Sequence, residues 1–464
     1  MHGRRYGVAL VALATLSALV SGCGTSGPSS SAPSTTAPPV ASSTAAPSTT
    51  AAPTTSSSSA ADYTGRTLTV WDYEADNSAM GLAWAKAVEI FKQEHPGVTV
   101  KVEAQTFEQI QKNAKIILTG NTVPDVMEYN KGNATAGQLA SQGLLTPLTD
   151  IAKQRGWDTI VTGGLATTAK YDAKGMMGSG DWYGVTNYGE YVTVYYNKDM
   201  FDKQGLKVPT TLDEFVTVLQ KFKDAGITPL AAAGAEYPMQ QVWYELLLGQ
   251  VDRAFVNDYQ MFTNDVDWKS ASMVKAADTL AEWVNKGYIS KDSAGLTAED
   301  MGTGFIAGTF PIMISGSWWF GRLLSEVKFN WGQFLFPGNK LNAGSSGNLW
   351  VVPASAKEKD LAYDFIGITL RPEVQNILGQ NGGLPVAGDP ASITDPATKL
   401  FTQNFQTAVQ NDQLAFYPDW PVAGFYDQLV SGFQSVVNGT KSSADVLNAL
   451  GTYYAAGKAD ILNG

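Results

Sequence analysis

Short apolar runs that alternate with longer segments of helical periodicity are the feature that most constrains this chain. Leu68–Trp71 and Val123–Met127 have the length and composition of strands, and valines alternate with polar residues over 98–102. Between these runs, apolar residues recur at helical spacing over Met80–Phe91 and Phe107–Leu118. This alternation predicts an α/β fold, in which a parallel sheet carries helices on its faces. Ligands of such sheets bind at the carboxyl ends of the strands.

A second series of strands and helices follows the first. Tyr191–Asn197 predicts a strand, and Thr211 with Glu214 three residues later forms a capping-box pattern that opens a helix. A further strand is predicted at Leu349–Val352. About 400 residues remain after the N-terminal segments, a length typical of two domains. Nothing over 61–464 resembles a linker, so two lobes would have to share crossing segments.

The first sixty residues have the composition of export and tether segments. Residues 1–22 combine a basic start with a short apolar run, which predicts a signal peptide too short to span a membrane. Cys23 is the only cysteine, and Leu19–Gly22 before it resembles a lipobox, so we expect Cys23 to carry a lipid. Small residues and proline make up 24–61 without any charge. Residues 23–61 are therefore expected to tether the protein to the outer face of the cell membrane.

Composition excludes several classes of function. Lys and Arg number 32 against 43 Asp and Glu, and the net charge of -11 opposes binding to nucleic acid. One cysteine and two histidines, His2 and His95, leave no basis for a metal centre or a nucleophile–histidine triad. His95 is expected at the surface, at the end of a helix. No nucleotide-binding fingerprint is present, so no cofactor is expected. Glycoside hydrolysis stays open, because it needs only two carboxylates.

Large aromatic residues lie beside carboxylates and amides at several predicted strand ends. A sugar ring has an apolar face and a rim of hydroxyls, so its site needs flat aromatic platforms edged by polar side chains. One aromatic residue in such a position more often packs in a core, but the whole set favours a carbohydrate site. The clusters are Trp71 and Tyr73 with Glu74, Tyr129 with Asn130, Tyr188 and Tyr191 with Glu190, Tyr237 and Trp243 with Gln240 and Gln241, Trp318 after Ser317, Trp350 after Asn348, and Tyr417 and Trp420 with Asp419.

Three stretches, in this order, resemble the extracellular solute-binding proteins of carbohydrate ABC importers, the maltodextrin-binding-protein-like group called family 1. The first is Val123–Val126, the second runs in pieces over Trp182–Phe215, and the third is Phe305–Trp318. Their order and spacing cover nearly all of 66–460. The family usually has tryptophan where this chain has Leu212, on a helix expected to lie far from the ligand.

The resemblance implies a two-lobed, periplasmic-binding-protein-like fold of type II, with a hinge of about three crossing segments. These crossings are expected near 188–192, 314–318 and 370–373. Residues 66–187 with 319–370 would form the N-terminal lobe, and 192–313 with 374–464 would form the C-terminal lobe.

The resemblance also implies a receptor rather than an enzyme. Such a monomer captures a sugar or oligosaccharide in the cleft by hinge closure and delivers it to ABC permease subunits, without metal, cofactor or nucleic acid. The many aromatic residues favour a di- to tetrasaccharide. A secreted glycoside hydrolase and a surface polysaccharide-binding module are the alternatives. The expected ligand-binding residues are Trp71, Tyr73, Glu74, Asn130, Tyr188, Glu190, Tyr237, Trp243, Trp318, Asn348, Gly383, Asp419 and Trp420.

Overall fold

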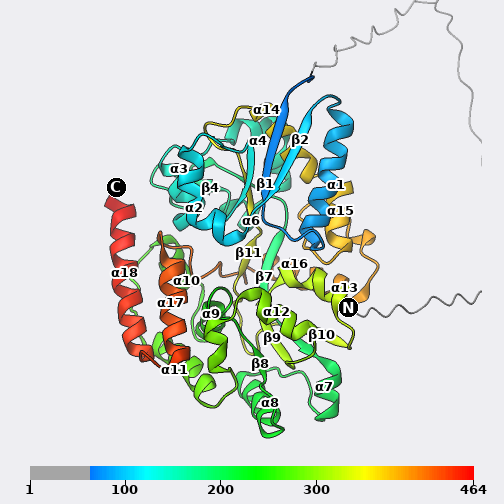
Figure 1. Cartoon of the computed structure of the whole chain (residues 1–464). Helices are drawn as coiled ribbons and strands as arrows, with labels where there is room; N and C mark the ends of the chain where they lie inside the picture. The colour runs from blue at the N-terminus through cyan, green and yellow to red at the C-terminus, as the bar shows by residue number, and fades with distance from the viewer. Residues whose placement is uncertain (1–62, 464) are drawn as a thin grey trace, which may run out of the picture. The chain divides into compact units, whose positions relative to one another are not determined.

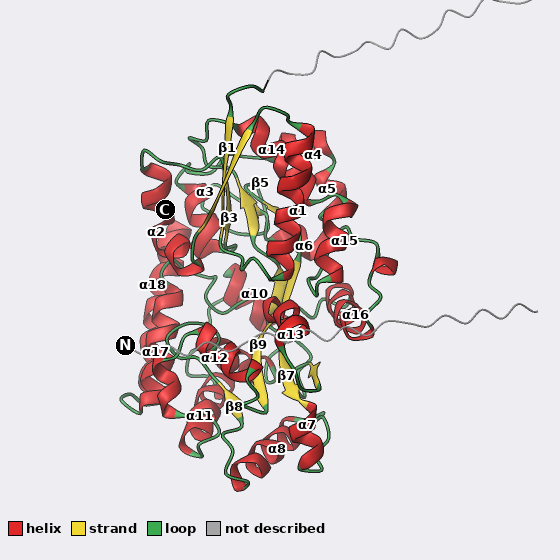
Figure 2. Ribbon diagram, turned by 45° about the vertical axis from the view of Figure 1, so that its right-hand side comes forward, coloured by secondary structure: helices red, strands yellow, loops and turns green. Residues whose placement is uncertain are grey.

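The computed structural model describes residues 63–463. The predicted signal peptide, the expected lipid attachment at Cys23 and the tether over 24–61 lie outside the described residues. The described part has two lobes, each built on its own β-sheet, and the strands of both sheets lie between helices (Figures 1 and 2). No helix within 63–463 is both long enough and apolar enough to cross a lipid bilayer.

The first sheet has the strand order β2-β1-β3-β12-β6. The strands β1, β2 and β3 are parallel, and Val70 at the centre of β1 lies opposite both Val102 and Val126. β12 runs antiparallel to β3 and β6. The parallel strands predicted from the alternating pattern are therefore confirmed. The strands are β1 (Thr67–Asp72), β2 (Thr99–Ala104), β3 (Val126–Tyr129), β6 (Val185–Thr186) and β12 (Leu349–Val351).

Local signals in the sequence set the ends of the helices around this sheet. The Ser78 side chain accepts a hydrogen bond from the Gly81 N–H at the start of α1, and Thr106 and Gln109 form a capping box at the start of α2. The helix α1 packs against α14 and α15. These elements are α1 (Ala79–Glu94), α2 (Phe107–Thr119), η1 (Asn133–Gly137), α3 (Gln138–Ser141), α4 (Thr149–Arg155), α5 (Trp157–Ile160), α6 (Gly163–Thr167), α14 (Lys359–Thr369) and α15 (Pro372–Gln380), with a small hairpin of β4 (Lys170–Tyr171) and β5 (Asp181–Trp182).

The second sheet has the strand order β10-β7-β9-β8, and β11 also pairs with β7. β7 is its longest strand and runs antiparallel to β9, β10 and β11, whereas β8 runs parallel to β9. The strand predicted at 191–197 is confirmed as part of β7. The strands are β7 (Gly189–Asn197), β8 (Leu230–Ala231), β9 (Ile312–Gly316), β10 (Trp331–Phe334) and β11 (Gly344–Ser346).

Helices α9, α11, α17 and α18 pack together beside the second sheet, and α12 packs on β8 and β9. The predicted capping box of Thr211 and Glu214 is confirmed at the start of α8. The remaining helices are α7 (Lys198–Lys203), α8 (Leu212–Asp224), α9 (Met239–Leu248), α10 (Arg253–Met261), α11 (Ala271–Asn285), η2 (Lys291–Gly295), α12 (Ala298–Ile306), η3 (Ser317–Trp319), α13 (Phe320–Glu326), η4 (Pro390–Ser392), α16 (Pro396–Gln410), α17 (Phe425–Asn438) and α18 (Ser443–Asn463).

The chain passes between the two sheets at three places. Residues 187–188 join β6 to β7, close to the first expected crossing. Residues 347–348 join β11 to β12, and 381–395 join α15, which packs on α1, to α16, which packs on β7. At the third passage the Gly189 N–H donates to the Leu384 carbonyl, which ties two passages together.

Strand pairing revises one part of the expected lobe boundaries. Residues 319–370 were expected to belong to the N-terminal lobe, but β10 and β11 pair with β7 of the second sheet. Residues 331–346 therefore lie with the second sheet, and the second passage comes after them rather than near 314–318. Residues 374–380, expected in the C-terminal lobe, lie in α15, which packs on α1 of the first lobe, so the third passage comes at 381–395 rather than near 370–373. The other lobe boundaries stay predictions.

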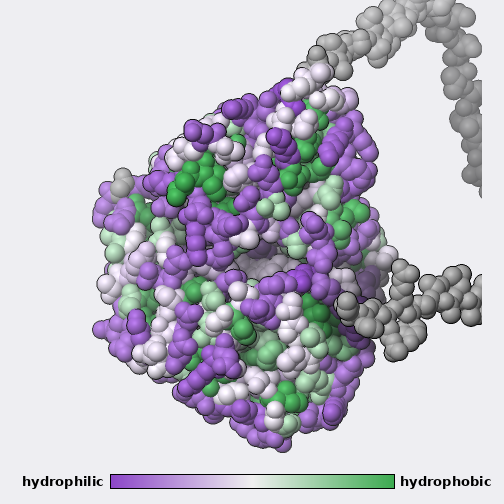
Figure 3. Space-filling model, in the orientation of Figure 1, coloured by the Kyte–Doolittle hydropathy of each residue, from purple (hydrophilic) through white to green (hydrophobic). Residues whose placement is uncertain are grey.

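The described residues form a large apolar core that extends through both lobes. Most of the surface shown in Figure 3 is hydrophilic, and the hydrophobic residues on that face form small, scattered groups. This distribution is typical of a water-exposed surface.

Candidate functional site

A cavity of about 480 Å³ lies between the two lobes. Its volume is in the range typical of small-molecule sites. Its walls come from the loops after β1 and β3 and the start of α2 in the first lobe, and from the start of β7, the start of α9, η3 and the segment before α17 in the second. The lining residues are Tyr73, Glu74, Thr106, Phe107, Glu108, Asn130, Lys131, Glu190, Glu236, Tyr237, Gln241, Ala298, Trp318, Asn348, Tyr417, Trp420 and Tyr426.

A buried ion pair joins the lobes in the wall of the cavity. Lys131 Nζ, on the loop after β3, lies 2.6 Å from Glu190 Oε2 on β7 and 3.1 Å from Asn348 Oδ1. Both charged side chains are less than a tenth exposed. The ammonium also lies over the rings of Tyr417 at 5.7 Å and Trp420 at 5.3 Å, a cation–π arrangement. One lysine of the first lobe therefore fixes a carboxylate and two rings of the second.

Neighbouring carboxyl groups surround this ion pair. Burial raises the pKa of Glu74 to about 8, and the negative charges of Glu190 and Asp72 add to the effect. Burial and the charge of Glu74 also raise the pKa of Glu128 well above its usual value. The Tyr188 hydroxyl lies 3.4 Å from a carboxyl oxygen of each of these two glutamates. Burial and the neighbouring negative charges therefore both favour the protonated form of Glu74, the form that can donate a hydrogen bond.

Aromatic side chains form the other surfaces of the cavity. The Trp318 ring packs over Gly316, two residues earlier in the chain. A Cβ atom at position 316 would lie 1.9 Å from this ring, so only glycine allows the indole to take its position. At the opposite side, Phe107 of the first lobe lies 6.0 Å from the Tyr237 ring and 6.4 Å from the Tyr426 ring of the second, measured between ring centroids. Flat apolar faces thus lie next to carboxylates and amides, as a sugar ring requires.

Hydrogen bonds also connect the lobes beside these rings. The Tyr426 hydroxyl on α17 donates to Glu108 Oε1 on α2 over 2.5 Å. The Ala134 N–H donates to the Trp420 carbonyl over 2.9 Å, and Asn133 Nδ2 donates to the Gln260 carbonyl over 3.0 Å. The structure therefore has its lobes in contact around the cavity.

Eight of the thirteen residues expected to bind a ligand line this one cavity. They come from both lobes and from segments as far apart in the sequence as Tyr73 and Trp420. They are Tyr73, Glu74, Asn130, Glu190, Tyr237, Trp318, Asn348 and Trp420.

The structure places the other five elsewhere. Trp243 is fully buried on α9 against Trp268 and Phe433, and Trp71 is buried in the core on β1. In each case the ring points inward because the face of the element on which it lies packs against the lobe. Three further residues lie outside the lining: Tyr188, which accepts a hydrogen bond from Asn348 behind the wall; Asp419, which is buried facing Tyr237; and Gly383, which packs against Leu378 after α15.

Several lining residues were not predicted. Lys131, Phe107, Glu108, Glu236 and Tyr426 lie on predicted loops or helix starts. The charged residues were missed because such side chains are usually exposed, and the two rings because a single aromatic residue more often packs in a core. One signal in the sequence could have indicated Lys131, namely the glycine that follows it, because a glycine after a strand often marks a close approach of another part of the chain. Gly132 indeed has φ of 108°, and a Cβ there would lie 2.6 Å from Trp420.

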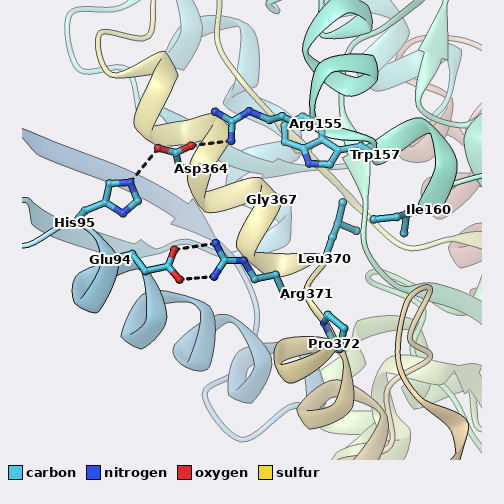
Figure 4. A pocket seen from close by; sticks show the side chains of 10 residues that line it. All are labelled: Glu94, His95, Arg155, Trp157, Ile160, Asp364, Gly367, Leu370, Arg371 and Pro372. Carbon is cyan, nitrogen blue, oxygen red and sulfur yellow. Dashed lines mark hydrogen bonds and ion pairs between the residues drawn. The ribbon is translucent and has the colours of Figure 1, made fainter. Parts of the chain in front are cut away.

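A second cavity, of about 590 Å³, lies on the first lobe beside the ends of α1 and α14. Figure 4 shows that its charged side chains are paired with one another: Arg371 with both carboxylate oxygens of Glu94, and Asp364 with Arg155 and His95. The charges of these side chains are therefore neutralised within the protein.

His95 is buried and stacked on Phe91, so the prediction that it lies at the surface was wrong. Asp364 supplies a hydrogen-bond partner for its ring, which allows the burial.

Within 63–463, no group of three or more His, Cys, Asp or Glu side chains is arranged to hold a metal ion. The carboxyl groups of the interlobe cavity are instead engaged with Lys131, hydroxyl groups and one another. The arrangement can enclose a small polar molecule, stack on its apolar faces and bond to its hydroxyls.

A family model described as bacterial extracellular solute-binding protein matches residues 86–414, more than half of the chain. A probable sugar-binding periplasmic protein of Mesorhizobium japonicum is 29% identical over 210 residues, covering 44% of this chain and 48% of that protein. The multiple sugar-binding protein of Streptococcus mutans is 30% identical over 222 residues, covering 45% of this chain and 53% of that protein. The matched part thus spans about half the length of each of these relatives, which are named as binding proteins.

A solved structure of a chitin oligosaccharide binding protein superposes with a TM-score of 0.73 at 21% identity, covering 85% of this chain and 99% of that one. At this identity the likeness concerns the fold. The expected α/β, two-lobed periplasmic-binding fold is thereby confirmed.

Proposed function

Because this chain belongs to the bacterial extracellular solute-binding proteins, we propose that its interlobe cavity captures a sugar or short oligosaccharide, which the protein delivers to an ABC importer. The family resemblance of the sequence is confirmed by this membership. The relatives named as sugar-binding proteins support the choice of a carbohydrate.

The observation that carries the proposal is the composition of the cavity wall. Four partly exposed rings, those of Tyr73, Phe107, Tyr237 and Trp318, lie beside carboxyl and amide side chains. Both amide atoms of Gln241 and the Tyr417 hydroxyl are buried without a hydrogen-bond partner within 63–463. Buried polar groups usually have partners, so these are suited to ligand hydroxyls.

Capture follows from the contribution of both lobes to one cavity. A ligand that contacts Tyr73 and Asn130 on one lobe and Tyr237 and Trp318 on the other stabilises the closed arrangement over an open one. Micromolar affinity corresponds to roughly -8 kcal/mol. A few stacked rings and several buried hydrogen bonds can supply this free energy net of the cost of closure.

The proposed setting is the outer face of the cell membrane. Cys23 would carry the lipid, and the charge-free segment over 24–61 would serve as the tether that lets the folded part reach permease subunits. The protein acts there as a monomer.

We propose a receptor without catalytic activity. A glycoside hydrolase would need one carboxylic acid and a second carboxylate free to act on the glycosidic bond. In the cavity wall, the Glu190 carboxylate is paired with Lys131 and Glu108 accepts from Tyr426. Incubation with oligosaccharides should therefore release no reducing ends, and release at an enzymatic rate would favour the hydrolase.

A thermal-shift screen of mono- to tetrasaccharides tests the receptor function. A ligand at 100 times its dissociation constant adds about 2.7 kcal/mol to the free energy of unfolding, which raises the melting temperature measurably. Isothermal titration calorimetry on each hit then gives its stoichiometry, expected to be one ligand per chain. Absence of any hit among such sugars would contradict the proposal. Binding only to insoluble polysaccharide would favour the surface-module alternative.

A further inference from the structure

The ionisable side chains in the wall of the interlobe cavity are mostly acids. Four carboxyl side chains line it, from Glu74, Glu108, Glu190 and Glu236. Of the lining residues that the structure describes, Lys131 alone carries a positive charge.

That positive charge is already neutralised. The Lys131 ammonium is held by the Glu190 carboxylate, the Asn348 amide oxygen and two ring faces. Its side chain is 2% exposed, so it has little surface left for a ligand anion. A ligand carboxylate or phosphate would therefore enter the cavity without a cationic partner.

Anionic groups are disfavoured in this part of the cavity. Glu108 already has a cationic partner, because Lys112 Nζ lies 3.2 Å from its Oε2. Burial and the charge of Glu190 raise the pKa of Glu74. Burial also raises the pKa of Glu236, with a contribution from the charge of Glu108. A ligand carboxylate in the same place would be disfavoured in the same way, since burial and like charge both oppose ionisation.

From these charges we propose that the cavity accepts uncharged glycosides and rejects glycosides that carry a carboxylate, sulfate or phosphate. The neutral partners Gln241 and Tyr417 serve ligand hydroxyls, and a ligand amine is accepted because carboxylates and ring faces both attract cations. This inference rests on the proposed function of the site and specifies its ligand class.

Matched disaccharides in the gluco and galacto series provide the test. Within each series, the distal sugar carries a hydroxymethyl group, a carboxylate, the equally sized but uncharged carboxamide, or an amine. Calorimetry should show that the uronate binds at least about tenfold more weakly than the uronamide, because like charges in a desolvated site cost binding free energy. The amine should bind as well as the neutral parent or better.

Two variants connect the discrimination to named side chains. Glu236→Gln removes a half-buried charge and should reduce the ratio of the uronamide affinity to the uronate affinity. Glu190→Gln leaves the Lys131 ammonium without its carboxylate partner and should reduce that ratio further. Glu282→Gln, on α11 outside the cavity, is the matched control and should leave the ratio unchanged.

Equal binding of uronate and uronamide, or an equal loss for amine and uronate, would overturn the inference while leaving a carbohydrate receptor intact. If no member of the panel and no sugar of the wider screen binds, the proposed function itself fails. The two failures are therefore distinguishable.

Discussion

Lys131 and Glu190 show what a single pair of residues contributes across the cleft. Lysine and glutamate are rarely buried unless they are paired, and here each lies in the wall of the cavity with its charge neutralised by the other. Such a pair adds little stability compared with apolar side chains, but the loss of one partner leaves an uncompensated buried charge.

Lys131→Met should lower the free energy of unfolding by about 3–5 kcal/mol, because Glu190 then stays buried without its partner. The double variant Lys131→Met with Glu190→Gln should recover a large part of this loss, as a double-mutant cycle by urea denaturation will measure. Lys86→Met, which removes a solvent-exposed ion pair with Glu89, is the control and should change stability by less than about 1 kcal/mol. A double variant no more stable than Lys131→Met would contradict the pairing.

The raised pKa of Glu74 predicts how the free energy of unfolding depends on pH. Its pKa rises from an ordinary 4.5 to about 8 on folding, chiefly through burial. The stability that it contributes is thus fully present below pH 4.5 and is lost as pH rises through 8. Urea denaturation at pH 5, 7 and 9 should show a steeper fall for the natural protein than for Glu74→Gln, which cannot ionise. The exposed Glu89→Gln serves as the control, and equal slopes for all three proteins would refute the role of Glu74.

For single residues, the sequence pattern indicated a cavity lined by rings and carboxyl groups, but it did not distinguish the residues that line the cavity from those in the core. Tyr73 and Trp71 are equivalent in a pattern of rings beside carboxylates, yet only Tyr73 lines the cavity. Two residues apart, they would share one face of a continuing strand, so the difference lies in the turn that follows the end of β1 at Asp72. Lys131 was missed because a lysine after a strand is usually solvated, and its burial depends on rings that lie almost 290 positions later.

The loop after β3 is the element that joins the two lobes at the cavity. Gly132 in this loop has φ of 108° and lies against Trp420, so Gly132→Ala would introduce both backbone strain and a clash. We expect it to lower the free energy of unfolding by about 1–3 kcal/mol. Gly164→Ala, in α6 with open space at the Cβ position, is the matched control and should be neutral or slightly stabilising. Thermal denaturation of both variants measures the contrast, and equal effects would contradict this account.

Elements were predicted well wherever local signals define them. The capping box at Thr211 depends only on neighbouring residues and is found as expected at the start of α8. Gly120 at the end of α2 and Pro372 at the start of α15 are local signals of the same kind. The passage between sheets at 347–348 could not be located in the same way. It depends on the pairing of β10 and β11 with β7, more than 130 positions earlier in the chain, which no local pattern reports.

In the whole molecule, the hydrogen bond from Tyr426 to Glu108 should favour the closed arrangement of the lobes. Tyr426→Phe removes this bond and should weaken ligand affinity about fivefold, which corresponds to roughly 1 kcal/mol. Small-angle X-ray scattering of the ligand-free variant should give a larger radius of gyration than the natural protein. A loss of affinity without any change in scattering would instead mean that Tyr426 acts only as a ligand contact. Tyr453→Phe, whose hydroxyl bonds to Ala423 within the second lobe, is the control.

The strand β7 carries Glu190 as its second residue, directly after the chain leaves the first sheet. A residue in the wall of the cavity therefore lies two positions from a passage of the chain between the two sheets. Under the proposed function, a substitution of Glu190 that changes which ligand binds should also change the rate at which that ligand is released.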